Sequence, residues 1–236
     1  MLTIGNTKTA KGEKLGILTG ILHLSPGDLS GHQVCPSASQ GCLAACLNTA
    51  GRGQMTPIQT ARIKKTRLFF EDRAAFMQQL AKSIESLIRK AKREGMTPAV
   101  RLNGTSDLPW EKIAFGDYRS LFEAFPDVQF YDYTKIRARA LKFAKGWMPA
   151  NYHLTFSATE SNHADCEAVA AAGGNVAVVF DHLPETYLGL PVIDGDVTDV
   201  RFQDPAGVVV GLKAKGKAKH DTSGFVRKII PIKVAA

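Results

Sequence analysis

The chain is poor in cysteine and tryptophan, with four and two residues among 236. Four cysteines, three of them crowded together, do not fit the disulfide framework of a small secreted protein. No apolar run approaches the roughly 20 residues that span a bilayer, and residues 1–8 lack the charged-then-apolar order of a secretory signal. We therefore expect a protein of a reducing cytoplasm without a membrane partner.

Composition is otherwise that of a globular protein, with 44% hydrophobic and 22% charged residues. No repeat, low-complexity tract or Pro/Gly/Ser-rich linker divides the chain, so we predict a single domain over residues 1–236. The formal net charge of +8 favours a polyanionic partner such as a nucleotide or a nucleic acid.

Apolar runs alternate with amphipathic segments along most of the chain. The strand-like runs are residues 15–24, 99–103, 128–134, 152–158, 176–181, 191–193 and 208–212. The helix-like segments are residues 58–70, 73–93, 118–125, 136–145 and 163–172. Such alternation is typical of right-handed βαβ crossovers and a mainly parallel sheet. We predict an α/β fold that resembles a partial or complete TIM-type β/α barrel, with an open doubly wound sheet as the alternative.

The most distinctive segment is the cysteine loop, residues 32–48, which contains Cys35, Cys42 and Cys46. Cys42 and Cys46 are four residues apart, so a helix over residues 41–48 would place both thiols on one face. Three thiolates select zinc or an iron–sulfur cluster and leave one coordination position open. We predict a metal site at these three cysteines, with a 4Fe-4S cluster favoured over zinc. The alternative is that they are reduced, buried cysteines.

A zinc ion would need a fourth ligand, for which His32 and Cys166 are the candidates. Cys166 lies in an amphipathic segment, where a free cysteine usually packs in the core. His153 lies inside a predicted strand and is expected to be a core histidine. His182 follows a predicted strand and is a further candidate for a site role.

Polar residues gather where the predicted strands end, and the cysteine loop also follows a strand. Ligands of parallel α/β folds bind at the carboxyl ends of the strands. We predict that Asp107, Asp132 and Lys135 act in catalysis, as general bases or as charged groups that hold a ligand. The predicted cofactor-binding residues are Asn103, Gly104, Thr105, Ser106, Tyr131, Ser157 and Asp181. For each carboxylate taken singly, the alternative is a helix cap or a salt bridge.

Residues 211–220 alternate lysine with small residues after the last predicted strand. Such a loop can contact phosphates without reading a base sequence. It has no aromatic residue for stacking on bases, and the Gly-x4-Gly-Lys-Ser/Thr order of a P-loop is absent. We interpret it as a polyanion-facing loop, with a solvated basic loop as the alternative.

These motifs together resemble the bacteriophage gene product 88-like proteins, a family of phage and prophage proteins. The motifs, in order, are Gly5-Asn-Thr-Lys-Thr9, Leu24-Ser-Pro-Gly27, Cys35-Pro36, Gly41-Cys42-x3-Cys46, Arg101-x-Asn103-Gly-Thr-Ser-Asp107, Phe130-Tyr-x-Tyr-Thr-Lys135 and Val209-Val-Gly-Leu-Lys-Ala-Lys215. The resemblance implies a phage origin and a location in the host cytoplasm. It does not imply an activity.

The layout is also similar to that of radical S-adenosylmethionine enzymes. In those enzymes three cysteines follow the first strand of a partial β/α barrel, and the next strand end binds the amino acid part of the cofactor. Residues 103–106 would occupy that second position here. The spacing departs, because this chain has Cys-x6-Cys-x3-Cys where those enzymes have Cys-x3-Cys-x2-Cys. The similarity is therefore one of layout and not of motif.

These observations favour a phage-encoded iron–sulfur enzyme, similar to radical S-adenosylmethionine enzymes, that modifies a nucleotide or a nucleic acid. Its expected cofactors are a 4Fe-4S cluster and S-adenosylmethionine. The first alternative is a non-catalytic phage protein that binds nucleic acid or a host factor and holds a structural zinc or cluster. The second alternative is a zinc-dependent hydrolase or transferase.

Overall fold

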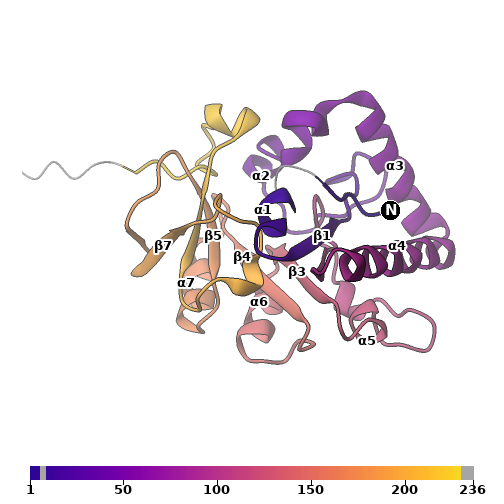
Figure 1. Cartoon of the computed structure of the whole chain (residues 1–236). Coiled ribbons are helices and arrows are strands. Elements are labelled where there is room, and N and C mark those ends of the chain that lie inside the picture. Colours follow the sequence, from indigo (N-terminus) through magenta and orange to yellow (C-terminus); the bar gives the residue numbers. More distant parts are fainter. Residues whose placement is uncertain (6–8, 230–236) are drawn as a thin grey trace, which may run out of the picture.

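The computed structural model describes residues 1–5 and 9–229, which form a mixed α/β fold around one eight-stranded sheet (Figure 1). The strands are β1 (Ile17–Ile21), β2 (Thr97–Arg101), β3 (Gln129–Thr134), β4 (Tyr152–Ser157), β5 (Val176–Phe180), β6 (Thr186–Tyr187), β7 (Leu190–Asp194) and β8 (Val209–Lys213). Their order in the sheet is β1-β2-β3-β4-β5-β8-β7-β6. Neighbouring strands run parallel, except that β6 is antiparallel to β7.

The mainly parallel α/β sheet is thus confirmed. Its order runs from β1 at one edge to β6 at the other, and within the described residues these two edges do not pair. The strand order alone therefore does not establish the predicted barrel. What it does establish is that β1 to β5 and β8 point their carboxyl ends toward the same edge of the sheet.

Helices occupy the connections from β1 to β5, as the alternation predicts, and one further helix precedes β1. They are α1 (Thr9–Glu13), α2 (Gln40–Ala44), α3 (Thr56–Glu71), α4 (Arg73–Arg93), α5 (Leu121–Ala124), α6 (Arg137–Ala144) and α7 (His163–Ala171). Helix α4 packs on β1 and β2, α6 on β3 and β4, and α7 on β4 and β5. In Figure 1 α5 and α6 lie in the lower part of the picture and α2 in the upper part. Across residues 1–5 and 9–229, no helix combines the length and apolarity needed to cross a membrane.

Helix α4 shows how local sequence builds the layer beneath the sheet. The Asp72 side chain accepts a hydrogen bond from the N–H of Ala75 (2.9 Å) and caps the first turn. Gly95, with φ at +65°, follows the helix end in the left-handed conformation that glycine tolerates. The fully buried residues recur every three or four positions: Phe76, Leu80, Ile84 and Leu87. Truncating one of them, as in Leu80→Ala, would cost about 2–5 kcal/mol.

The aromatic core links this helix layer to the functional edge of the sheet. The ring of Phe69 packs edge-on against Phe76 (5.2 Å between centroids) and against Trp110 (5.5 Å). The indole N–H of Trp110 donates to Oδ1 of Asn103 (3.1 Å), in the loop that follows β2. Core packing therefore fixes the position of this loop.

Candidate functional site

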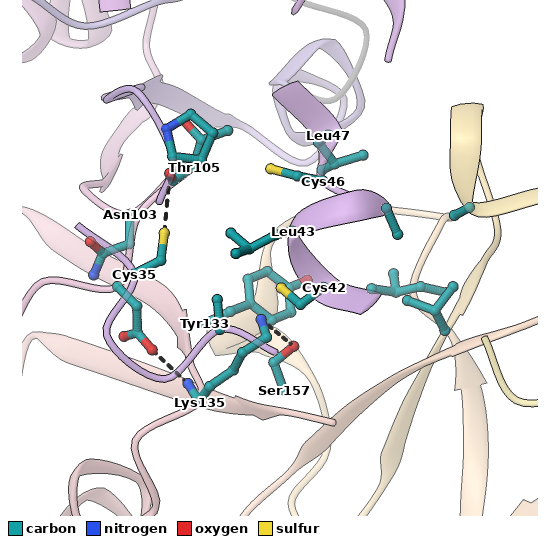
Figure 2. Close-up of a pocket in the computed structure, with 18 of the residues that line it drawn as sticks. Cys35, Cys42, Leu43, Cys46, Leu47, Asn103, Thr105, Tyr133, Lys135 and Ser157 are labelled. Carbon is teal, nitrogen blue, oxygen red and sulfur yellow. Dashed lines mark hydrogen bonds between the residues drawn. The ribbon is translucent and has the colours of Figure 1, made fainter. Parts of the chain in front are cut away.

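A cavity of about 200 Å³ lies at the carboxyl ends of the parallel strands, beside the cysteine loop (Figure 2). The sheet contributes Arg101, Tyr133, Ser157, Val179, Leu212 and Lys213 to its wall. The connections after β2 and β3 contribute Asn103, Gly104, Thr105, Ser106, Asp107 and Lys135. The cysteine loop contributes Cys35, Cys42, Leu43, Cys46 and Leu47. Ten of the thirteen residues predicted for the site therefore border one cavity.

The three thiols reach the cavity by a different route from the one predicted. Helix α2 ends at Ala44, so Cys46 lies beyond it and the condition for one shared helical face, a helix over residues 41–48, is not met. Cys46 instead begins the short turn Leu47–Thr49, where its Sγ accepts from the N–H of Asn48 (3.5 Å). The Cys35 thiol donates to the carbonyl of Thr105 (3.7 Å), as Figure 2 shows.

A carboxylate from the far side of the site holds α2 in place. Glu160, which follows β4, accepts hydrogen bonds from the hydroxyl of Ser39 (2.6 Å) and the N–H of Gly41 (2.8 Å). Ser39 in turn caps α2 by accepting from the N–H of Cys42 (3.2 Å). A Cβ atom at Gly41 would lie 2.9 Å from the Glu160 carboxyl carbon, so glycine permits the close approach. Burial raises the pKa of Glu160, but hydrogen bonds from Ser39, from its own N–H and from Gly41 together bring it below the ordinary value.

The electrostatics of the thiols depend on burial and on two nearby cations. Burial raises the pKa of Cys35 to about 11 and also raises the pKa of Cys46. The charges of Lys135 and Arg62 lower the pKa of Cys46 but do not outweigh burial. Both groups are therefore protonated thiols at neutral pH, and a metal that binds them must displace their protons.

Lys135 lies beside the thiols and in contact with the sheet. Its Nζ donates to the hydroxyl of Ser157 (3.3 Å), as Figure 2 shows. Burial lowers the pKa of Lys135, but the charges of Cys42 and Asp107 raise it further, so it lies above the ordinary lysine value. Lys135 is therefore a retained positive charge next to Cys42.

The thiols border the cavity without converging on one point. In the part of the chain that the structure describes, no three His, Cys, Asp or Glu side chains are placed to hold a metal ion. A single zinc ion, with bonds of roughly 2.3 Å to sulfur, requires its thiolates much closer together than a four-iron cluster, which takes one cysteine per iron. The three cysteines therefore remain predicted metal ligands.

Asp107 lines the cavity, but its carboxylate is used within the fold. It accepts from the hydroxyl of Thr134 (2.9 Å), the N–H of Lys135 (2.7 Å) and the guanidinium of Arg139 (2.8 Å). Arg139 also pairs with Glu111 at 2.8 Å. This is the salt bridge that we gave as the alternative for a strand-end carboxylate. Through its bond from the N–H of Lys135, the Asp107 carboxylate fixes the backbone at Lys135.

The loop after β2 is likewise held by its own polar groups. Oδ1 of Asn103 accepts from the hydroxyl of Ser106 (2.8 Å) and the N–H of Leu108 (2.9 Å). A Cβ atom at Gly104 would lie 2.6 Å from the carbonyl oxygen of Leu22, so only glycine allows this approach to the end of β1. Asn103 and Gly104 thus shape the wall of the cavity.

Three predicted site residues lie outside the cavity lining. Asp132 is fully buried on the opposite face of β3, where it accepts from the N–H of Asn103 (2.6 Å) and from the hydroxyl of Tyr152 (3.1 Å). Tyr131 lies deeper in the fold, against Phe202 (5.5 Å between rings). Asp132 does not border the cavity because successive strand residues face opposite sides. Tyr131 is on the same face of β3 as Tyr133 but lies deeper in the strand, away from the cavity lining.

Asp181 is the third predicted site residue outside the cavity lining. It lies just beyond β5 and accepts from the N–H groups of His182 (2.7 Å) and Ile229 (3.2 Å). The imidazole of His182 pairs with the same carboxylate at 3.0 Å. Both side chains are partly exposed and bind each other at the protein surface, and neither lines the cavity.

The candidates for a fourth metal ligand do not reach the thiols either. Cys166 is buried among apolar side chains, as its core-packing interpretation predicts, and burial raises its pKa to about 11. The ring of His32 stacks on Phe70 with 4.4 Å between centroids. The zinc hydrolase or transferase interpretation gains no support from these placements.

Arg101 and Tyr133 line the cavity but were not predicted as site residues. The guanidinium of Arg101 lies over the ring of Tyr133 at 4.6 Å and pairs with Asp199 at 3.1 Å. An arginine at the end of an otherwise apolar strand is the signal that could have identified it. Lys213 and Lys215, from the predicted polyanion-facing loop, line the cavity beside Asp196.

The comparisons with known proteins give a family and no closer relative. No curated protein and no solved structure matches the chain. The radical S-adenosylmethionine layout thus has no support beyond the sequence pattern. A family model described as Gene product 88 matches residues 1–229, which confirms the resemblance to that family. The chain belongs to the gene product 88 family.

Proposed function

We propose that the cavity is the active site of a phage-encoded iron–sulfur enzyme that modifies a nucleotide or a nucleic acid. The observation that carries the proposal is that Cys35, Cys42 and Cys46 all border one cavity at the carboxyl ends of parallel strands. The fourth cysteine, Cys166, is buried in the core and has no part in the cavity. A structural need for small apolar residues would not concentrate three thiols at this edge of the sheet.

The chemistry of the three thiol donors supports a cluster. Three cysteines supply one ligand to each of three irons and leave the fourth iron open. The N–H of Asn48 donates to Cys46 Sγ, and the positive charges of Lys135 and Arg62 act on the same sulfur. Hydrogen bonds and cations of this kind stabilise thiolate ligands. When bound, the cluster would supply one-electron or Lewis-acid chemistry.

The protein's own groups then position and enclose the ligands. Lys135, held by Ser157, balances thiolate charge near Cys42. Leu43 and Leu47 line the cavity beside the thiols and add apolar surface to its wall. The host cytoplasm is the compartment we propose, because a reducing environment preserves thiolate ligands. We also propose that the parallel strands form a partial barrel, since one cavity receives the ends of β2, β3, β4, β5 and β8.

The test is purification without oxygen, followed by a visible spectrum and a count of iron and acid-labile sulfide. We expect a brown protein with roughly four irons and four sulfides per chain. A colourless protein with stoichiometric zinc would overturn the proposal. Formation of 5′-deoxyadenosine from S-adenosylmethionine under reduction then tests whether that cofactor is used.

A non-catalytic binding protein with a structural cluster is the second candidate. The observation that favours it is that Asp107, a cavity carboxylate predicted to act in catalysis, is engaged by Thr134, Lys135 and Arg139. Under this interpretation the protein retains iron and binds nucleic acid but leaves S-adenosylmethionine and nucleotides unchanged. Product analysis of the iron-loaded protein by mass spectrometry separates the two.

A further inference from the structure

Two buried polar atoms at the cavity lack a hydrogen-bond partner among the described residues. They are Nε of Arg101 and the hydroxyl of Tyr133, and both side chains line the cavity. Arg101 is only 7% exposed. A buried polar group without a partner costs roughly 1–3 kcal/mol, so such groups are rare unless a ligand or water satisfies them. Other buried atoms without a partner occur elsewhere among the described residues, but these two lie on the wall of the cavity, where a ligand can bond them.

The two groups are held in a fixed mutual arrangement. The Arg101 guanidinium lies over the ring of Tyr133 at 4.6 Å, and its Nη1 is bound to Asp199 at 3.1 Å. Asp199 therefore orients the guanidinium and leaves Nε–H available. Arginine can only donate, and the tyrosine hydroxyl can donate as well. The group that satisfies both is an acceptor oxygen of the ligand.

The charge of the lining favours an anionic acceptor. The cavity is bordered by the cations Arg101, Lys135, Lys213 and Lys215 and by the carboxylates Asp107 and Asp196. Lys213 pairs with Asp194 at 3.3 Å and Lys215 pairs with Asp196, so these two lysines add little free positive charge. Asp107 is bound by the buried Arg139 at 2.8 Å, and Arg101, although paired with Asp199, keeps its Nε–H unbonded among the described residues. Arg101 and Lys135 are therefore the cations on which binding of an anion depends. Arginine and lysine together are the usual groups that bind phosphate.

The size of the cavity limits the ligand. The cysteine-loop side and the lysine-rich loop of residues 211–220 come close together beside the cavity. A Cβ atom at Gly216 would lie only 2.9 Å from Cβ of Ala50. The volume of about 200 Å³ is below the roughly 300–1,000 Å³ of sites for drug-sized ligands. Such a site accepts a small molecule or the end of a single strand and excludes a duplex.

We propose that Arg101 and Tyr133 form a subsite for the phosphate monoester of a nucleotide, whose remaining part extends toward the thiols. The inference rests on the proposed function in that it takes the cavity as the active site, but it does not require the cluster. A free mononucleotide and the 5′-phosphorylated end of a strand share this chemistry.

The test is calorimetric titration of the protein with a nucleoside 5′-monophosphate, the matching nucleoside, inorganic phosphate and a short single strand with or without a 5′-phosphate. The monophosphate should bind at least tenfold more tightly than the nucleoside. If the phosphorylated strand binds more tightly still, the subsite is supported and its ligand is a strand end. Equal binding of nucleoside and monophosphate would overturn the subsite.

Variants connect the binding to the two residues. Tyr133→Phe removes only the hydroxyl and should weaken monophosphate binding about tenfold, and Arg101→Lys should weaken it by at least as much. Tyr118→Phe, at an exposed tyrosine, is the matched control and should change nothing. Unchanged binding in Tyr133→Phe would contradict the proposal even if the arginine variant fails to fold.

The same titration on protein before and after iron removal separates the two proposals. Monophosphate binding should persist without iron. If purified protein never contains iron, the proposed enzyme fails, whereas binding that depends on Tyr133 still supports the subsite.

Discussion

The two faces of β3 both carry polar side chains, and they differ in how completely those side chains are bonded. On the face toward the helices, Asp132 accepts from Asn103 and Tyr152, and Thr134 donates to Asp107. On the cavity face, the Tyr133 hydroxyl is buried without a partner among the described residues. Satisfied buried networks stabilise one fold, whereas unsatisfied groups beside a cavity indicate a ligand site. At β3, an unbonded hydroxyl that also borders the cavity thus distinguishes Tyr133 from Asp132.

The largest expected loss of stability comes from removing the buried ion pairs behind the helix-facing side of β3. Arg139 is 4% exposed and pairs with Asp107 and Glu111, so Arg139→Met leaves two buried carboxylates without their cation. We expect the free energy of unfolding to fall by about 3–5 kcal/mol in urea denaturation. The control is Arg137→Met, whose exposed pair with Asp165 should contribute less than about 1 kcal/mol. Equal losses in the two variants would contradict the comparison.

A pH series tests whether Asp132 is structural. Burial raises the pKa of Asp132 to about 7, so the folded protein retains a proton that the unfolded chain loses near its ordinary pKa of roughly 3.9. This contribution to stability is present at low pH and is lost as the pH rises through about 7.

Asp132→Asn removes that titration. The stability difference between wild type and variant should change by about 2–4 kcal/mol between pH 4 and pH 8, measured by denaturation at each pH. A constant difference would contradict the assignment. If Asp132 were instead a catalytic base, the variant would lose turnover at full iron content.

Tyr152 and Tyr133 allow a more direct comparison, with a smaller expected difference in the free energy of unfolding. Tyr152→Phe removes bonds to Asp132 and Arg139 and should cost about 1–2 kcal/mol. Tyr133→Phe removes a hydroxyl without a partner in the described structure and should change stability by less than about 0.5 kcal/mol. Urea denaturation of both variants measures this contrast, and a larger loss in Tyr133→Phe would reverse it.

Much of the fold was predictable because its elements have strong local signals. The helix predicted over residues 73–93 has the bounds of α4, since its apolar stripe, cap and terminal glycine agree. The cysteine loop was predicted to lie at the carboxyl ends of the strands, and it does. The local structure of residues 41–48 was not predicted. There a five-residue helix ends at Ala44, and a short turn over Leu47–Thr49 begins after Cys46.

Which strand-end residues face the cavity could not be predicted. Strand β3 is buried on both faces, so its sequence has no polar–apolar alternation to distinguish Asp132 from Tyr133. Asp181 lies one residue past β5 and turns to the surface. Glu160 gave no signal, because its partners Ser39 and Gly41 are more than one hundred residues away in the chain.

Alkylation of the four cysteines, measured residue by residue by mass spectrometry, tests the central claim most directly. The protein would be treated as isolated without oxygen and again after iron is removed by a chelator. The account predicts that Cys35, Cys42 and Cys46 are protected together in the first state and modified together in the second. Cys166, buried in the core, should stay unmodified in both until the protein is denatured. If the three cavity cysteines react equally in both states, the cavity does not hold a cluster.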